Sequence, residues 1–293
     1  MHKFHGSLVA LVSPFKEGKL DLAALEKMVD WHIKNGTHAI VPAGTTGECP
    51  TLTHEEHIQV VKTVVEVANH RIPVMAGAGS NNPVEAIYLS QAAEKAGADG
   101  LLHVAGYYNR PNQDGLYAHF KKLHDETNLP IFVYNIPGRA VVNILPETLA
   151  KMAELPRIAG IKDATGNLER PWLERQLIHK DDFTWLSGED STAVAYNVSG
   201  GCGVISVTAN IAPKLVSEVQ ELCAKCDFVK AREQQDKLMR LHKLMFKEPS
   251  PGPVKYAASL LGLCQDEVRL PVLPISEGLR QEIKSEMQKL GLI

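Results

Sequence analysis

The chain has 293 residues, of which 44% are apolar and 22% are charged, and its formal net charge is −3. The length allows one or two domains with a large core. The charge excludes a strongly basic surface for nucleic acid or anionic lipid, and no apolar run approaches the roughly 20 residues of a membrane span. Five scattered cysteines favour a reduced, cytoplasmic protein over a disulfide scaffold.

Short apolar runs alternate with segments of helical periodicity along the first half of the chain. Runs typical of strands buried on both faces lie at 7–13, 39–42, 73–77, 100–104 and 130–134. Helices are expected to begin at Asp21, at a capping box made by Thr53 and Glu56, at Asn82-Pro83 and near Asp114. The pattern predicts a parallel sheet, because only a crossover helix joins neighbouring parallel strands.

The alternation continues to about residue 224. Further strands are expected at 158–162, 183–186 and 203–207, with helices beginning at Pro146, near Leu168 and near Pro213. Eight strand–helix units predict a (β/α)8 TIM barrel over residues 1–224. A doubly wound sheet is the alternative, but no glycine-rich phosphate loop follows the first strand.

Strand patterns stop after residue 224. Helices are expected at 228–246, 254–262 and 276–290, separated by a proline-rich break at 248–253. Residues 225–293 therefore form a predicted C-terminal helical domain, packed on the barrel or on a partner subunit.

Lys162 ends the sixth predicted strand, between apolar residues and a Thr-Gly turn. One interpretation is an ordinary surface lysine. The other is an amine held out of water, where desolvation lowers its pKa and leaves a nucleophilic lone pair. Asp163 follows directly, but strand alternation turns it to the opposite face, so the two are not expected to pair.

Active sites of such barrels form where the strands end. The second strand leads into Gly-Thr-Thr-Gly-Glu at 44–48, which is either a carboxylate or phosphate cradle or a plain turn. The fifth strand ends at Tyr134, with Arg139 just beyond as a carboxylate ligand or a solvated charge. Because Tyr134 and Lys162 lie on neighbouring strands, they are expected to face one small volume.

A strand-end lysine next to a tyrosine and an anion cradle favours imine chemistry. The amine would attack the ketone of a 2-oxo acid, and the tyrosine would transfer protons with the help of other hydroxyls. No metal-binding motif and no G-x-S-x-G elbow is present in the sequence. The sequence thus indicates an enzyme that needs no metal or other cofactor.

Six motifs, in order along nearly the whole chain, resemble the dihydrodipicolinate synthase family of class I pyruvate-dependent aldolases and lyases. They are GTTGE at 44–48, YYNRP at 107–111, YNIP at 134–137 followed by Arg139, GIKDATG at 160–166, GVISVTAN at 203–210 and EPSPGPVK at 248–255. The resemblance implies a lyase that condenses pyruvate with L-aspartate 4-semialdehyde to 4-hydroxy-tetrahydrodipicolinate, on the way to diaminopimelate and lysine.

The resemblance also implies residue roles. Lys162 forms the Schiff base with pyruvate, Tyr134 donates and accepts protons, and Thr45 with Tyr108 of a neighbouring subunit completes a relay. Thr46 and the backbone of Ile205 hold pyruvate, and Arg139 binds the second substrate. The family is usually a homotetramer of two tight dimers. A lysine feedback site at the dimer interface is a further hypothesis, with the residues His54, His57, Asn81, Glu85 and Tyr107.

The sequence departs from the family pattern at two places, and three other functions compete with the synthase. Ala105-Gly106 replaces a common Thr-Pro, which puts the rigidity of that loop in question, and Ala140 stands where threonine is frequent. The rivals are a Schiff-base aldolase or lyase acting on a 2-oxo-3-deoxy sugar acid or N-acetylneuraminate, a barrel that binds a ligand without catalysis, and a phosphate-binding isomerase. The intact lysine and tyrosine argue against a binding protein, and Arg139 favours the synthase.

Overall fold

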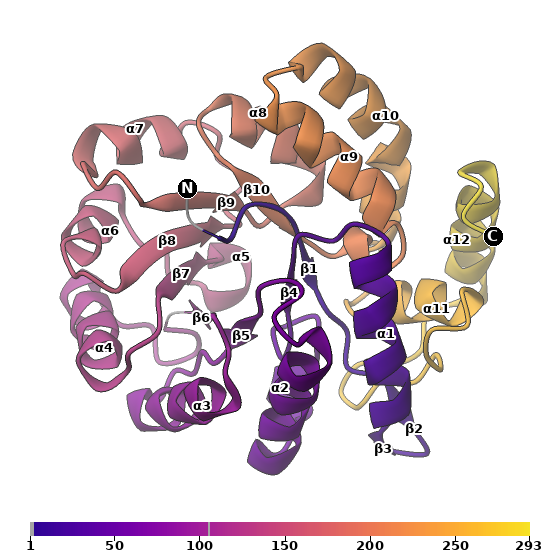
Figure 1. Ribbon diagram of the computed structural model, residues 1–293, viewed down its shortest axis with the longest axis horizontal. Coiled ribbons are helices and arrows are strands. Elements are labelled where there is room, and N and C mark those ends of the chain that lie inside the picture. Colours follow the sequence, from indigo (N-terminus) through magenta and orange to yellow (C-terminus); the bar gives the residue numbers. More distant parts are fainter. Residues whose placement is uncertain (1–2, 105) are drawn as a thin grey trace.

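A computed structural model describes residues 3–104 and 106–293, and within them eight parallel strands close into a barrel (Figure 1). The strands are β1 (Gly6–Ala10), β4 (Ala39–Val41), β5 (Met75–Gly77), β6 (Gly100–Val104), β7 (Ile131–Asn135), β8 (Ile158–Asp163), β9 (Thr184–Ser187) and β10 (Gly203–Ser206). Their order around the sheet is β4-β1-β10-β9-β8-β7-β6-β5. A parallel bridge between Ile40 and Val74 joins the two ends of this order. The TIM-barrel prediction is confirmed.

Helices cover the outside of the barrel. They are α1 (Leu22–Lys34), α2 (His54–Ala68), α3 (Pro83–Ala96), α4 (Gln113–Glu126), α6 (Pro146–Ala153), α7 (Arg170–Leu177), α8 (Ala193–Val198) and α9 (Pro213–Ala224). The one-turn helix α5 (Pro137–Ala140) lies inside this ring, directly after β7 (Figure 1). The predicted capping box is present, since the Thr53 side chain accepts from the Glu56 N–H and the Glu56 carboxylate accepts from the Thr53 N–H. The Asn82 side chain likewise caps α3, with Pro83 in the first turn.

Three short elements were not predicted. They are α5, α8 and a hairpin of β2 (Phe15–Lys16) and β3 (Lys19–Leu20). Each is too short for a hydrophobic period to become visible in the sequence. The predicted first strand at 7–13 also ends earlier, at Ala10, because the Val12 N–H is bound by the Asn210 side chain instead of a neighbouring strand.

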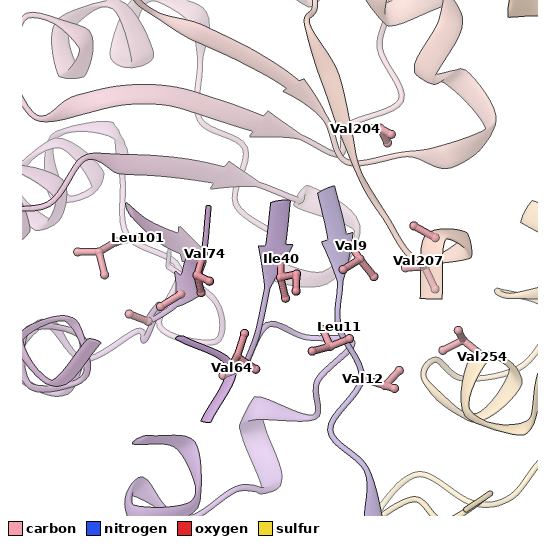
Figure 2. Close-up of a cluster of buried hydrophobic side chains, with 14 of the residues drawn as sticks. Val9, Leu11, Val12, Ile40, Val64, Val74, Leu101, Val204, Val207 and Val254 are labelled. Atoms are coloured by element: carbon pink, nitrogen blue, oxygen red, sulfur yellow. The ribbon is translucent and has the colours of Figure 1, made fainter. Parts of the chain in front are cut away.

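Alternate residues of each strand face two different cores. Val9, Ile40 and Val204 point outward into the layer between strands and helices (Figure 2), whereas Leu8 and Phe132 fill the barrel interior. Full burial of such side chains contributes about 1.5–3 kcal/mol each. Tyr134 lies two residues after Phe132 on β7, so its side chain faces the same side of the strand. The alternation that builds the core therefore also directs the tyrosine into the barrel.

The C-terminal segment packs on the barrel of its own chain. It forms α10 (Phe228–Leu244), α11 (Gly252–Leu260) and α12 (Glu277–Lys289), with α10 lying beside α9 (Figure 1). Val254 of α11 joins the same apolar cluster as Val9 and Leu11 (Figure 2). No helix in the described part of the chain is both long and apolar enough to cross a membrane.

Gly106 gives a physical reason for one departure from the family pattern. Its φ is +60°, a value that the proline ring cannot adopt. A Cβ atom there would also lie 2.8 Å from the Pro111 ring. The preceding Ala105 lies outside the described residues. The loop therefore depends on glycine, and proline at 106 would require a different backbone.

Candidate active site

Lys162 and Tyr134 are direct partners in the register of β8 and β7. The Lys162 ammonium nitrogen lies 4.1 Å from the centroid of the Tyr134 ring. Both side chains are buried, each with 7% of its surface exposed. The expectation that neighbouring strands direct this lysine and tyrosine into one volume is confirmed.

Burial determines the electrostatics of this pair. It lowers the pKa of the Lys162 amine to about 8, against the opposing effect of the Glu189 and Asp190 carboxylates. The same desolvation raises the pKa of the Tyr134 phenol well above its usual value. Near neutral pH the lysine therefore has a substantial fraction of free amine, whereas the tyrosine stays a protonated phenol. Of the two interpretations of Lys162, the structure favours the desolvated amine.

Loop 43–48 forms one wall of the pocket above this pair. Thr45 and Thr46 line that pocket together with Tyr134 and Lys162. The turn is fixed by hydrogen bonds from Glu48 N–H to Thr45 C=O at 3.1 Å and from the Ser13 hydroxyl to Gly47 C=O at 2.7 Å. A Cβ atom at Gly47 would lie 2.9 Å from the Leu11 carbonyl oxygen, so the turn packs this closely only with glycine.

Arg139 lies on α5 and lines the same pocket. Its side chain is exposed, and among the described residues no ion pair or side-chain hydrogen bond holds it. Its positive charge lowers the pKa of the Tyr134 phenol and so opposes part of the burial effect. A free guanidinium at the mouth of a pocket can bind a carboxylate with two parallel hydrogen bonds.

The pocket lining also includes Glu189, Phe246 and Ser250, none of which was predicted as a site residue. Glu189 follows β9, and burial together with the neighbouring Asp190 raises the pKa of its carboxyl group. A strand-end carboxylate was visible in the sequence at this position. Phe246 and Ser250 come from the segment between α10 and α11, and no local sequence signal places that segment over the barrel.

Two residues predicted for the site, Ile205 and Tyr108, do not place their side chains in the described lining of the pocket. The Ile205 side chain is buried in the barrel interior, and it is not among the described side chains that line the pocket. Tyr108 is 91% exposed, with a positive φ of +65° that is unusual for a bulky residue. It too is absent from the described residues that line the pocket of its own chain, so a catalytic role for its hydroxyl requires another subunit.

The residues predicted for a feedback site lie in two connected pairs. His54 Nε2 is 2.6 Å from Glu85 Oε1, and the Asn81 amide donates to the Tyr107 carbonyl at 3.2 Å. His57 is buried nearby, and burial lowers the pKa of its imidazole to about 4. Glu85 also accepts a hydrogen bond from Ser80. His54, His57 and Glu85 therefore lie together at the N-terminal ends of α2 and α3, whereas the Asn81 amide contacts the Tyr107 backbone.

Asp163 belongs to a separate network behind the barrel wall. Its carboxylate lies 3.4 Å from the Arg170 guanidinium, which also binds Glu174 at 2.6 Å. The expectation that Asp163 does not pair with Lys162 is confirmed. Within residues 3–104 and 106–293 no group of histidine, cysteine, aspartate and glutamate is arranged to hold a metal ion.

The fold is a (β/α)8 barrel, and the desolvated lysine at the end of β8 is a primary amine that can act as a nucleophile. Together they place the chain in the class of barrel proteins that can form a covalent bond to their substrate through a lysine. The chain belongs to the dihydrodipicolinate synthetase family, whose model matches residues 3–290. It is 53% identical over 290 residues to the 4-hydroxy-tetrahydrodipicolinate synthase of Parvibaculum lavamentivorans, covering 99% of both chains. It is 54% identical to the protein of that name from Roseobacter denitrificans, again over 99% of both.

Solved structures agree with this assignment. Dihydrodipicolinate synthase from Aquifex aeolicus superposes with a TM-score of 0.97 at 42% identity, with 99% of each chain covered. The enzyme from Acinetobacter baumannii, solved in complex with pyruvate, gives a TM-score of 0.95 at 44% identity and the same coverage. The enzyme from Cyanidioschyzon merolae, solved with lysine bound, gives 0.96 at 35% identity over all of both chains.

Proposed function

We propose that this protein condenses pyruvate with L-aspartate 4-semialdehyde to give 4-hydroxy-tetrahydrodipicolinate, through a Schiff base at Lys162. The observation that carries the proposal is the desolvated Lys162 amine, partnered in register by Tyr134 at the bottom of a pocket. The names of the relatives from P. lavamentivorans and R. denitrificans support it. The reaction would supply the pathway to diaminopimelate and lysine.

The first step uses the free amine of Lys162. Its nitrogen lone pair attacks the ketone carbon of pyruvate, a C–N bond forms, and the carbonyl oxygen becomes a hydroxyl that leaves as water. Tyr134 is a neutral phenol near pH 7 because burial raises its pKa, so it begins as the proton donor. A phenol this weakly acidic needs a relay to return the proton. Thr45 and Tyr108 of a neighbouring subunit are proposed to form that relay.

The second step joins the two substrates. Loss of a proton from the pyruvate methyl group gives an enamine, whose carbon attacks the aldehyde of L-aspartate 4-semialdehyde and regenerates the imine. The amino group of the second substrate then attacks the imine carbon, which closes the ring, and the Lys162–carbon bond breaks to release the product and the free lysine amine. Thr46 and the backbone of Ile205 are proposed to hold the pyruvate carboxylate, and Arg139 the carboxylate of the second substrate. The exposed guanidinium of Arg139 at the pocket wall, which no described residue pairs with, supports that assignment. No step requires a cofactor.

The rival reaction, aldol cleavage of a 2-oxo-3-deoxy sugar acid or N-acetylneuraminate, would use the same lysine and tyrosine. The names of the relatives favour the synthase. Turnover with L-aspartate 4-semialdehyde and none with N-acetylneuraminate is the expected result. The reverse preference would replace the proposed second substrate and leave the Schiff base intact.

We further propose a cytoplasmic homotetramer of two tight dimers, built from protomers with a barrel domain (1–224) and a helical domain (225–293). The Tyr108 ring is 91% exposed and is absent from the described residues that line the pocket of its own chain, which supports the proposal that it contacts another subunit. Mixed dimers would test the shared site. Tyr108→Phe and Lys162→Met homodimers are each expected to be inactive, whereas their heterodimer contains one complete site and regains activity.

Lysine feedback is proposed at His54, His57, Asn81, Glu85 and Tyr107. The hydrogen-bonded carboxylate of Glu85 offers a partner for an ammonium group. The related C. merolae enzyme, which was solved with lysine bound, supports the idea. Unchanged activity at millimolar lysine would refute it.

Trapping the imine tests the central proposal. The protein is incubated with pyruvate, reduced with borohydride, digested and analysed by mass spectrometry. The expected result is one pyruvate adduct at Lys162, absent from Lys162→Met. A label on another lysine, or no label, would overturn the mechanism.

A further inference from the structure

A buried ion pair connects the pocket wall to the C-terminal helices. Lys255 of α11 has no exposed surface, and its ammonium nitrogen lies 2.7 Å from Glu48 Oε1. Glu48 is 4% exposed, and its other oxygen accepts from the Arg269 backbone N–H at 2.9 Å. Both oxygens of this carboxylate are therefore held by residues far along the chain.

Glu48 also ends the 43–48 loop. Its backbone N–H donates to the Thr45 carbonyl, which closes the turn that presents Thr45 and Thr46. Its φ of +56° is left-handed, a conformation that a residue other than glycine keeps only when its surroundings hold it. The contact with Lys255 is thus made by the last residue of the turn that forms the wall of the pocket.

A second set of contacts reinforces the first. The Arg269 guanidinium binds both oxygens of Glu56 at 2.6 Å, in the first turn of α2. Lys255 and Arg269 both pack against the Phe15 ring, at 4.0 and 4.2 Å from its centroid. The start of α2 and the hairpin containing Phe15 are therefore tied to the same C-terminal segment as Glu48.

Stability alone is a weak reason for such a pair. Removing two charges from water costs about as much as their attraction returns, so apolar residues of the same volume would stabilise the fold as well. What a buried, hydrogen-bonded pair adds is a defined geometry. Neither Glu48 nor Lys255 is among the described residues that line the pocket, whereas Thr45 and Thr46 are.

We propose that Glu48 and Lys255 are positioning residues, which fix the 43–48 loop so that the Thr45 and Thr46 hydroxyls face the reacting pyruvate. The inference rests on the proposed function and deepens it, because it assigns part of the catalytic geometry to the C-terminal helices. Displacement of the loop would weaken pyruvate binding through Thr46 and slow proton transfer through Thr45.

The double variant Glu48→Gln/Lys255→Met tests this proposal. It keeps the approximate shape of both side chains and leaves no buried charge unpaired, so it is expected to fold with a melting temperature near that of the wild type. The KM for pyruvate should rise and kcat should fall, with kcat/KM lower by about tenfold or more, since small misplacements near the reacting atoms have large effects on rate. Wild-type kcat and KM in the folded double variant would overturn the proposal.

Two further variants separate positioning from general destabilisation. Glu48→Gln alone removes the counterion of the buried Lys255 and leaves one acceptor for two donors, so it should lower the melting temperature more than the double variant and change kcat and KM in the same direction. Arg280→Met breaks the Arg280–Asp266 ion pair of the same C-terminal segment without touching Glu48, and it should leave kcat and KM within about twofold of wild type. Equal kinetic losses in Arg280→Met and the double variant would refute a positioning role.

The wild-type protein distinguishes failure of this inference from failure of the proposed function. If wild type forms no adduct at Lys162 and gives no turnover, the proposed function fails. If wild type is active and the double variant matches it, only the positioning role fails.

Discussion

The pH dependence of imine formation is a quantitative test of the buried Lys162 amine. With a pKa of about 8, about a tenth of the amine is unprotonated at pH 7, compared with about three in ten thousand for an exposed lysine. Since only the free amine attacks pyruvate, the initial rate of imine formation should rise about tenfold from pH 6 to pH 7. It should rise about fivefold more to pH 8 and level off above pH 9.

Rapid quenching into borohydride, followed by mass spectrometry of the Lys162 peptide, measures this rate. Glu189→Gln provides an internal check. The Glu189 carboxylate favours the charged lysine, so its removal should move the inflection to lower pH. An inflection above pH 10 in wild type, or a shift to higher pH in Glu189→Gln, would refute the assignment of a desolvated amine.

Three other substitutions follow from the same geometry. Lys162→Met should stabilise the fold by about 3 kcal/mol at pH 7, because the charged Lys162 amine destabilises the native state below pH 8. This destabilisation decreases as the pH rises towards 10.5. Thermal unfolding of wild type and variant at pH 7 and pH 10 measures the difference in unfolding free energy at each pH. Tyr134→Phe should lower kcat by about 10²–10⁴-fold without unfolding the protein, and near-wild-type steady-state turnover would contradict its role. Arg139→Lys should raise the KM for L-aspartate 4-semialdehyde by about tenfold and leave the pyruvate KM unchanged. A rise in the pyruvate KM alone would assign Arg139 to pyruvate instead.

Hydrophobic periodicity and helix-capping residues, both visible in short stretches of sequence, made most of the fold predictable. The alternation of apolar runs with helical periods predicted the barrel, and the cap residues Thr53 and Asn82 predicted where α2 and α3 begin. The meeting of Tyr134 with Lys162 followed from strand adjacency and the two-residue period, without any long-range information. Short elements such as α5 and α8 escaped detection because one or two turns contain too few residues to show a pattern.

Contacts between distant segments were not predictable from one sequence. Nothing near Glu48 in the sequence indicates that Lys255 or Arg269 binds it, and nothing near Phe246 indicates that it lines the pocket. The sequence also left two interpretations of Lys162 open, a desolvated amine and an ordinary surface lysine. Its pKa depends on the total burial by the surrounding strands, which no local pattern expresses.

The Glu48–Lys255 contact has a consequence for the order in which the protein is made. The two residues are 207 positions apart, so at a synthesis rate of about 5–20 residues per second Glu48 leaves the ribosome about 10–40 seconds before its partner. Throughout that interval the nascent barrel lacks the contact that fixes its pocket wall. The pocket wall is therefore fixed only after the last helices have docked, so the site cannot be complete before nearly the whole chain has been made.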